Sequence, residues 1–247
     1  MACSALRPPL RSASPFKHLG EKKLVKTIIF DNDGVLVDTE KLFFEANRAA
    51  LAEIGVELTL DDFCEISLRQ GKSCLATALK GQADEGFLST LRQRRDALYE
   101  QLLMAETVER EGIRQVLEAL RDRCRFGVVT NAKRRHFEIM HARTSLLPYF
   151  SFVLTLEDFR FRKPHPDPYL TALRLYNLQP SETLSVEDSE RGVRSAAAAG
   201  LRCIAAPTDL TRDGDFGLAF QRIEDLSQLI EIIRPLYRMT KEPTNNE

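Results

Sequence analysis

The sequence predicts an α/β fold, in which a parallel sheet domain carries an inserted all-helical cap domain. After residue 108, short apolar runs alternate with segments of helical spacing, which is typical of a parallel sheet with right-handed crossovers. The first apolar run, residues 24–30, is separated from these by residues 39–105, where only helical spacing occurs. We therefore expect a sheet domain from residues 24–38 and 106–238, with the cap formed by residues 39–105.

The expected strands are short, because each is a buried run of β-branched and apolar residues. They are residues 24–30, 126–129, 152–154, 184–186 and 203–205. The expected helices between them are residues 112–121, 133–142, 168–176 and 189–199. In the cap, apolar residues recur at helical spacing from Leu42 to Ile54 and again from Leu88 to Leu103.

Composition excludes several classes of protein. The 247 residues carry a formal net charge of −1, which argues against a generic nucleic-acid binder. No apolar run approaches the roughly 18 residues that a membrane-spanning helix needs. Hydrophobic residues make up 43% of the chain, enough for a sizeable core. We expect a monomer with neither a nucleic-acid partner nor a membrane partner.

The cysteines and histidines do not form a metal-binding motif. The five cysteines are widely spaced and include no C-x-x-C, which favours reduced thiols and a cytoplasmic location. His136 and His141 are five residues apart and so miss the i,i+4 spacing of a helical metal pair. We expect both histidines at the surface.

The two ends of the chain differ from the rest. Residues 1–23 are basic and contain the adjacent pair Pro8 and Pro9, which fits a disordered tail, or a start codon assigned too early, better than a transit peptide. Residues 239–247 are expected to form a second tail.

Chemically active side chains follow the expected strands, at the edge where an open parallel sheet binds its ligands. In chain order they are Asp31, Asp33, Thr130, Asn131, Lys163, Glu187 and Asp188. Each has a plain structural alternative, since Asp and Gly form turns, Thr and Ser cap helices, and a loop lysine is commonly solvated. We interpret them as one site, because these alternatives would all have to coincide, each after its own strand.

The residue types suit phosphoryl transfer. Three acids in one site repel each other unless a cation is present, and the oxygens of Asp31, Asp33 and Asp188 suit Mg²⁺. Lys163 and the hydroxyl of Thr130 would supply donors for the transferring oxygens. The carboxylate of Asp31 could then attack phosphorus, with Asp33 protonating the leaving oxygen and later activating water.

The chain resembles the haloacid dehalogenase superfamily, in particular its phosphatases with a small helical cap. The resemblance rests on the motifs DNDGVLVDT, VVTNA, RKPHPDPY and VEDSERGVRSAAAAG. It implies a three-layer, Rossmann-like core and a Mg²⁺ cofactor. It also implies that Asp31 is the nucleophile and Asp33 the general acid/base.

The same resemblance implies the ligands of the phosphate and of the metal. The phosphate ligands would be Thr130, Asn131 and Lys163. The metal ligands would be Asp31, the backbone carbonyl of Asp33, and Asp188, with Glu187 beside them.

The activity implied is that of a Mg²⁺-dependent phosphomonoester hydrolase acting on a small, sugar-type phosphorylated metabolite. Residues 201–204 and 211–216 look like those of xylulose-1,5-bisphosphate phosphatases. The β-phosphoglucomutase pattern has an arginine where Cys74 stands and a histidine where Phe43 stands, which disfavours the alternative of a phosphoglucomutase-like phosphotransferase. A catalytically idle interaction protein is also disfavoured, because drift would erase the acids first.

Substrate choice is expected to reside in a loop of the cap, because the cap is the only other surface expected to face the site. The candidate residues are Arg69, Lys72 and Ser73, of which Lys72 alone matches the loop of the bisphosphatases. The alternative is that the two charges are solvated at the start of the following helix. Hinges of the cap are expected near residues 37–39 and 105–108.

Overall fold

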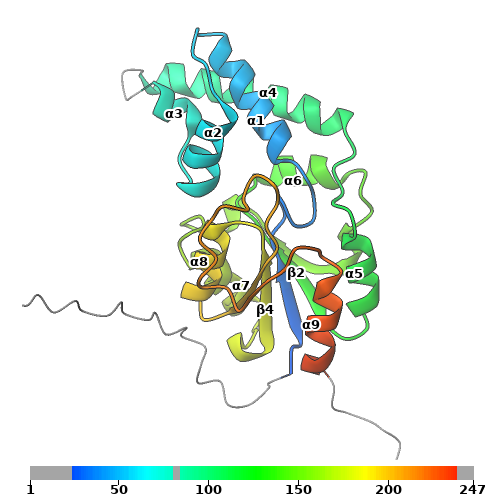
Figure 1. Cartoon of the computed structure of the whole chain (residues 1–247). Helices are drawn as coiled ribbons and strands as arrows, with labels where there is room; N and C mark the ends of the chain where they lie inside the picture. The colour runs from blue at the N-terminus through cyan, green and yellow to red at the C-terminus, as the bar shows by residue number, and fades with distance from the viewer. Residues whose placement is uncertain (1–23, 80–83, 238–247) are drawn as a thin grey trace, which may run out of the picture.

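A six-stranded parallel sheet forms the centre of the sheet domain (Figure 1). The computed structural model describes residues 24–79 and 84–237, so the expected tails at residues 1–23 and 239–247 lie outside the described residues. The strand order is β3-β2-β1-β4-β5-β6. The strands are β1 Thr27–Phe30, β2 Arg125–Val129, β3 Phe150–Leu154, β4 Thr183–Glu187, β5 Arg202–Ala205 and β6 Gln221–Arg222.

The strand β1 lies in the middle of the sheet, between β2 and β4, because it is apolar on both of its faces. All of its residues are buried. Ile28 and Phe30 pack into the hydrophobic cluster on one face of the sheet, whereas Ile29 packs into the cluster on the other. A strand of this kind suits a parallel sheet that is covered on both faces. The residue after β1, Asp31, therefore lies at the centre of the carboxyl edge of the sheet.

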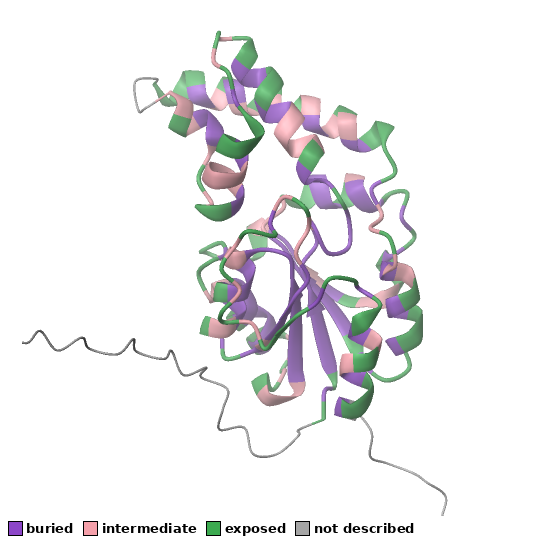
Figure 2. Ribbon diagram, in the orientation of Figure 1, coloured by how far each residue is buried: buried purple, intermediate pink, exposed green. Residues whose placement is uncertain are grey.

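Helices cover both faces of the sheet and complete three layers, so the predicted fold class is confirmed (Figure 1). One face packs against α5 Ile113–Leu120, α6 Arg134–His141 and α9 Gln228–Tyr237. The other face packs against α7 Asp167–Leu175 and α8 Glu190–Ala198. Short 3₁₀ turns join some of these elements, at Leu147–Tyr149, Leu156–Asp158 and Pro180–Glu182. Figure 2 shows buried strands with the helices turning their buried faces toward them.

Between residues 39 and 106, the part of the chain that the structure describes is helical wherever it is regular. Its helices are α1 Glu40–Ala52, α2 Leu60–Phe63, the π-helical segment η1 Cys64–Arg69, α3 Cys74–Ala78 and α4 Glu85–Ala105. These helices share a hydrophobic cluster of their own that includes Leu51, Phe63, Leu75 and Leu91. In Figure 1 they lie above the carboxyl edge of the sheet, so this cap covers the edge where the chemistry was predicted.

The two connections between the sheet domain and the cap are hydrogen bonded to each other. The amide of Asp38 donates to the carbonyl of Val108 at 2.7 Å, and the amide of Arg110 donates to the carbonyl of Leu36 at 3.0 Å. The hinge positions expected from the sequence therefore lie side by side, on one short paired ribbon.

Two expectations from the sequence differ from the structure. The strand β6 was not predicted, because its two residues are exposed and lack apolar alternation. The expectation that His136 and His141 lie at the surface is wrong, since both are buried. They share the buried face of α6 with Phe137 and Met140, at the spacing that turns one side of a helix to a core.

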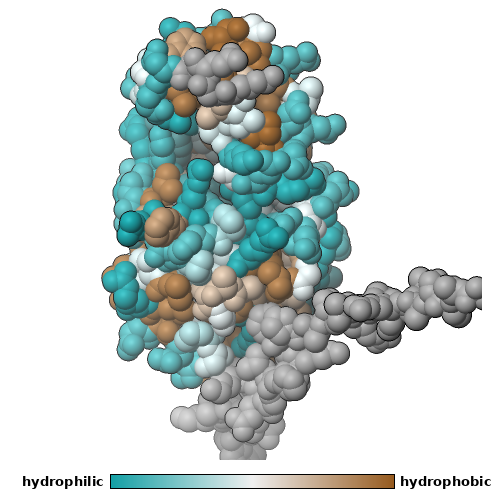
Figure 3. Space-filling model, turned by 90° about the vertical axis from the view of Figure 1, so that its left-hand side faces the viewer, coloured by the Kyte–Doolittle hydropathy of each residue, from teal (hydrophilic) through white to brown (hydrophobic). Residues whose placement is uncertain are grey.

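None of the described helices is both long and apolar enough to cross a membrane. On the face shown in Figure 3, hydrophilic side chains predominate and the apolar ones form separate patches. Isolated exposed apolar residues of this kind are normal for a folded protein.

Candidate active site

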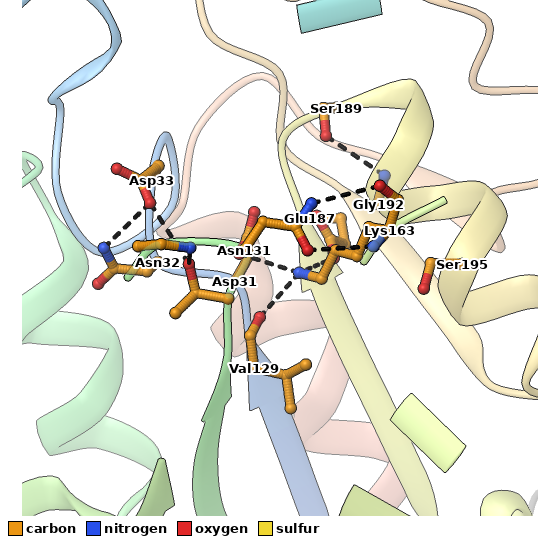
Figure 4. Close-up of polar contacts among 12 residues, drawn as sticks. Asp31, Asn32, Asp33, Val129, Asn131, Lys163, Glu187, Ser189, Gly192 and Ser195 are labelled. Atoms are coloured by element: carbon orange, nitrogen blue, oxygen red, sulfur yellow. Dashed lines mark hydrogen bonds and ion pairs between the residues drawn. The ribbon is translucent and has the colours of Figure 1, made fainter. Parts of the chain in front are cut away.

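The side chains predicted from the strand ends do meet at one edge of the sheet (Figure 4). Asp31 follows β1, Thr130 follows β2, and Glu187 ends β4, and these three strands are neighbours. The sheet pattern continues past the strand ends, because the amide of Asp31 donates to Val186 at 2.9 Å. Parallel pairing thus brings residues that are far apart in sequence to one place.

Lys163 is the buried cation of this site. Its Nζ lies 2.9 Å from Oδ1 of Asp31 and 2.6 Å from Oε1 of Glu187, and it donates to the carbonyl of Val129 at 2.7 Å. Burial alone would lower the pKa of Lys163, but the charges of Asp31 and Glu187 outweigh it and raise that pKa. The lysine is therefore charged, and it neutralises part of the acidic cluster.

Asn131 fixes the backbone of Lys163. Its Nδ2 donates to the carbonyl of Lys163 at 3.3 Å, while its Oδ1 accepts from the amide of Lys163 at 3.0 Å. The side chain predicted to bind phosphate is thus engaged in holding the lysine in place. Thr130 lies beside it, and its hydroxyl accepts from the amide of Ala132 at 3.0 Å and contacts Oδ2 of Asp33 at 3.4 Å.

Asp33 is half-buried and has hydrogen-bond partners on both oxygens. The hydroxyl of Thr39 donates to Oδ1 at 2.5 Å, and Nδ2 of Asn32 donates to Oδ2 at 3.3 Å. Burial raises the pKa of Asp33, the nearby charge of Asp31 raises it further, and the hydrogen bonds only partly oppose this. A carboxyl group in such a place is suited to carry and transfer a proton.

Asp31, Glu187 and Asp188 form a buried carboxylate cluster. One oxygen from each lies within 4.8 Å of the others. Burial raises the pKa of Glu187 to about 8, with the charge of Asp31 adding to the effect despite Lys163. Within the described residues, Oδ2 of Asp188 and Oε2 of Glu187 are buried without a hydrogen-bond partner. Unpaired, hard oxygen donors in a buried cluster fit a cation such as Mg²⁺.

Gly34 is required for this cluster to form. A Cβ at this position would lie 2.4 Å from Oδ2 of Asp188, and the φ of Gly34 is +76°, which disfavours other residues. The glycine that closes the Asp-Asn-Asp-Gly segment therefore allows the loop after β1 to approach Asp188.

Glu40 is a member of the site that sequence reasoning missed. This first residue of α1 is buried, and its Oε2 accepts from the hydroxyl of Thr208 at 3.1 Å. Burial raises the pKa of Glu40 to about 7, although hydrogen bonds from Thr208 and with Asp188 oppose the rise. In the sequence, a glutamate at a helix start suggests only a favourable dipole interaction.

A cavity of about 460 Å³ opens between the carboxylate cluster and the cap. Of the three cap residues predicted to select the substrate, Lys72 and Ser73 line the cavity. The hydroxyl of Ser73 also caps α3, accepting from the amide of Ala76 at 3.3 Å. The structure does not bring Arg69 to the cavity, because its guanidinium pairs with Glu65 at 2.6 Å on the outer surface.

The expectation that only the cap faces the substrate is wrong. Arg162 and Arg191, both from the sheet domain, line the same cavity. A Cβ on Gly71 of the cap loop would lie 3.1 Å from Cδ and from one terminal nitrogen of Arg191, so the loop and this arginine are in contact. The cavity is therefore lined by basic side chains from both the cap and the sheet domain, and the charge of Arg191 also acts on Asp188 and Glu40.

Comparison with known proteins identifies relatives of this chain. Residues 28–206 match the family described as haloacid dehalogenase-like hydrolase. The chain is 30% identical to the phosphorylated carbohydrates phosphatase of Thermotoga maritima, over 77% of this chain and 88% of the relative. It is also 30% identical to protein CbbY of Rhodobacter capsulatus, over 82% of this chain and 94% of the relative.

A solved structure gives the same result. The crystal structure of CbbY from Rhodobacter sphaeroides in complex with xylulose-(1,5)bisphosphate matches with a TM-score of 0.74 and 25% identity, over 83% of this chain and 96% of that one. The parallel core, the inserted helices and the acidic edge are thus those of a hydrolase. The chain belongs to the haloacid dehalogenase-like hydrolase family. Within that family it is an enzyme of the phosphatase branch, so the family predicted from the four motifs is confirmed.

Proposed function

We propose that this enzyme is a Mg²⁺-dependent hydrolase of a small, sugar-type phosphomonoester and that it works through an aspartyl-phosphate. The observation that carries the proposal is the buried cluster of Asp31, Glu187 and Asp188 around Lys163, with an oxygen of Asp188 left unpaired among the described residues. The sugar-type substrate is supported by the relative named as a phosphorylated carbohydrates phosphatase and by the sugar bisphosphate bound to CbbY.

The cation would be held by Asp31, the carbonyl of Asp33, and Asp188, with Glu187 beside it. When bound, it supplies positive charge that offsets the repulsion between the carboxylates and a phosphate dianion. Lys163 holds Oδ1 of Asp31 at 2.9 Å and so orients the carboxylate for attack on phosphorus. The hydroxyl of Thr130 and the backbone amides near Asn131 would receive the phosphate oxygens.

Asp33 would move the proton in both halves of the reaction. As an Asp31 oxygen bonds to phosphorus, the ester bond breaks and the leaving oxygen takes the proton of Asp33. Asp33 then takes a proton from water, whose oxygen attacks the phosphorus and releases inorganic phosphate and free Asp31. The raised pKa of Asp33 supports the first of these roles, because the group must arrive protonated.

The phosphotransferase alternative has less support. Phe43 and Cys74 line the cavity at the positions where the mutase pattern has a histidine and an arginine. Neither side chain carries the positive charge that would bind a bisphosphate while it reorients. The alternative of a catalytically idle interaction protein is disfavoured, because burying these acids costs free energy and such a protein would not need them.

The proposal also covers where the enzyme is located and how many chains it contains. All the described cysteines, Cys64, Cys74, Cys124 and Cys203, are free thiols, which supports a cytoplasmic enzyme. We propose a monomer whose partner is the phosphorylated metabolite alone, which size-exclusion chromatography with light scattering would test.

The test of the activity uses the purified enzyme and a metal chelator. We expect hydrolysis of p-nitrophenyl phosphate in Mg²⁺, its loss in EDTA and its return when Mg²⁺ is added. A panel of sugar phosphates then ranks the leaving groups. Activity that persists at the same rate in EDTA would overturn the metal assignment, and no release of phosphate from any ester would overturn the proposed function.

A further inference from the structure

The catalytic scheme makes no use of His141, a buried histidine near the end of α6. Its side chain is 3% exposed and does not line the cavity. The ring nevertheless has a polar partner on each side. Its Nε2 lies 2.7 Å from Oδ1 of Asn32, and its Nδ1 lies 2.9 Å from the hydroxyl of Thr144.

Asn32 connects this histidine to Asp33. The asparagine is fully buried, and its carbonyl oxygen faces His141. Its Nδ2 faces the opposite way and donates to Oδ2 of Asp33 at 3.3 Å and to the sulfur of Met140 at 3.1 Å. Rotating the amide by half a turn would place its oxygen against Oδ2 of Asp33. Two acceptors would then oppose each other whenever Asp33 is ionised, as it must be before it activates water.

The contacts define one tautomer of the ring. An amide oxygen can only accept, so Nε2 of His141 must carry the proton, and Nδ1 must accept from the hydroxyl of Thr144. The amide of Leu146 donates to that same hydroxyl oxygen at 3.3 Å. The hydroxyl has two acceptors within reach, and the ring nitrogen at 2.9 Å is closer than the backbone carbonyl of His141 at 3.5 Å. Burial lowers the pKa of His141 to about 4, so the ring is neutral near pH 7.

We propose that His141 is a positioning residue for the catalytic acid: its Nε2–H locks the Asn32 amide so that the NH₂ group faces Asp33. The ordered donors run from Thr144 through His141 and Asn32 to Oδ2 of Asp33. With Oδ2 held in this way and Oδ1 held by Thr39, the Asp33 carboxyl keeps one orientation toward the leaving oxygen. This inference rests on the proposed function, because it assumes that Asp33 donates the proton.

Comparing substrates whose leaving groups differ in acidity distinguishes this positioning role from a purely structural role of His141. A sugar alkoxide needs a proton from Asp33 as it leaves, whereas p-nitrophenolate does not. In His141→Leu we expect kcat for a sugar phosphate to fall about tenfold more than kcat for p-nitrophenyl phosphate, with KM unchanged. His141→Gln keeps an N–H donor where Nε2 lies, so we expect it to restore most of the difference.

Phe137→Leu is the matched control. Phe137 is buried on the same helix, and its ring lies 4.4 Å from that of His141. We expect this variant to lower the melting temperature without separating the two substrates. If His141→Leu slows both substrates by one factor, or if a folded His141→Gln behaves like His141→Leu, the positioning role is wrong.

A second measurement does not depend on activity. Nitrogen-15 spectra of the imidazole rings report which nitrogen carries the proton. We expect His141 in the Nε2–H form, and in Asn32→Leu we expect that signal to move. An Nδ1–H ring or a protonated ring near pH 7 would overturn the inference, even in an enzyme whose substrate is not the one proposed. A wild-type enzyme inactive on both esters would overturn the proposed function, and the spectra would still decide the tautomer.

Discussion

The hydroxyl of Thr39 donates to Oδ1 of Asp33 at 2.5 Å, although Thr39 occupies the N-cap of α1 and makes no side-chain capping bond there. Threonine at this position normally satisfies a free amide of its own helix. Here the hydrogen bond joins the first turn of the cap to the carboxyl group assigned to proton transfer. The position of the cap and the state of Asp33 are therefore coupled.

Replacing Thr39 by valine should change the pH dependence of the reaction. The hydrogen bond from Thr39 lowers the pKa of Asp33, so its loss raises that pKa further. Because the first chemical step needs protonated Asp33, the alkaline limb of kcat/KM should move to higher pH. Thr59→Val is the control, since Thr59 caps α2 at 3.1 Å and its loss costs about 1 kcal/mol of stability without touching the site. An unmoved alkaline limb in Thr39→Val would contradict the coupling.

Asp31→Asn should abolish turnover and leave the fold intact. The substitution removes the attacking charge at nearly constant volume, so kcat should fall at least about a thousandfold. The melting temperature should stay near that of the wild type or rise, because one of the crowded carboxylates becomes neutral. Asp38→Asn makes the same chemical change at an exposed residue outside the cavity and should retain activity. Near-normal rates in Asp31→Asn would exclude this residue as the nucleophile.

Glu40 should make the metal-free protein less stable as the pH rises. Its pKa is about 7 in the folded protein against 4.5 for the free side chain, so the unfolded chain loses this proton first. Stability therefore falls as pH rises from about 4.5 to about 7, and Glu40→Gln should remove that loss. In EDTA at about pH 8, the variant should be more stable than the wild type by on the order of 2 kcal/mol.

Urea unfolding at several pH values measures this difference. At about pH 4 the two proteins should unfold alike, because Glu40 is then protonated in both states. Glu53→Gln, at an exposed residue that pairs with Arg94 at 2.7 Å, should keep the pH dependence of the wild type. A constant difference between Glu40→Gln and the wild type at every pH would show that the effect does not come from ionisation.

The cap loop carries two basic residues, and only one of them is expected to affect KM. Lys72 lines the cavity, so Lys72→Met should raise KM for the natural sugar phosphate by about tenfold and leave KM for p-nitrophenyl phosphate unchanged. Arg69 pairs with Glu65 outside the cavity, so Arg69→Met should change neither value. Steady-state kinetics with both substrates decides this. Equal changes for both substrates in Lys72→Met would mean that the loop does not contact the leaving group.

The sheet domain could be predicted from the sequence because its rules are local. Each strand except β6 is a short apolar run, and parallel pairing brings the carboxyl ends of these strands to one edge, where Asp31, Thr130 and Glu187 lie. The helical spacing of Phe137 and Met140 also indicates a buried face of this helix, which His136 and His141 share although the two histidines miss the spacing of a metal pair.

Other parts of the site could not be predicted, because they depend on where the cap lies. Glu40 joins the acids only because α1 begins against Thr208, which is far away in the sequence. Arg191 lines the cavity and approaches the cap loop at Gly71. Contacts between separate packing units leave no periodic pattern along the chain, and so no sequence signal pointed to these residues.

The paired connections at Asp38 and Val108 have a consequence for how such enzymes can diversify. Since the chain leaves the sheet domain and returns to it at touching points, 2.7 Å apart at the hydrogen bond, an inserted block needs only to begin and end close together. Exchanging that block costs little in loop closure and leaves the edge of the sheet as it is. The cap is thus a transplantable module: a chimaera joined at these two positions should inherit its preference for leaving groups from one parent and its chemistry from the other.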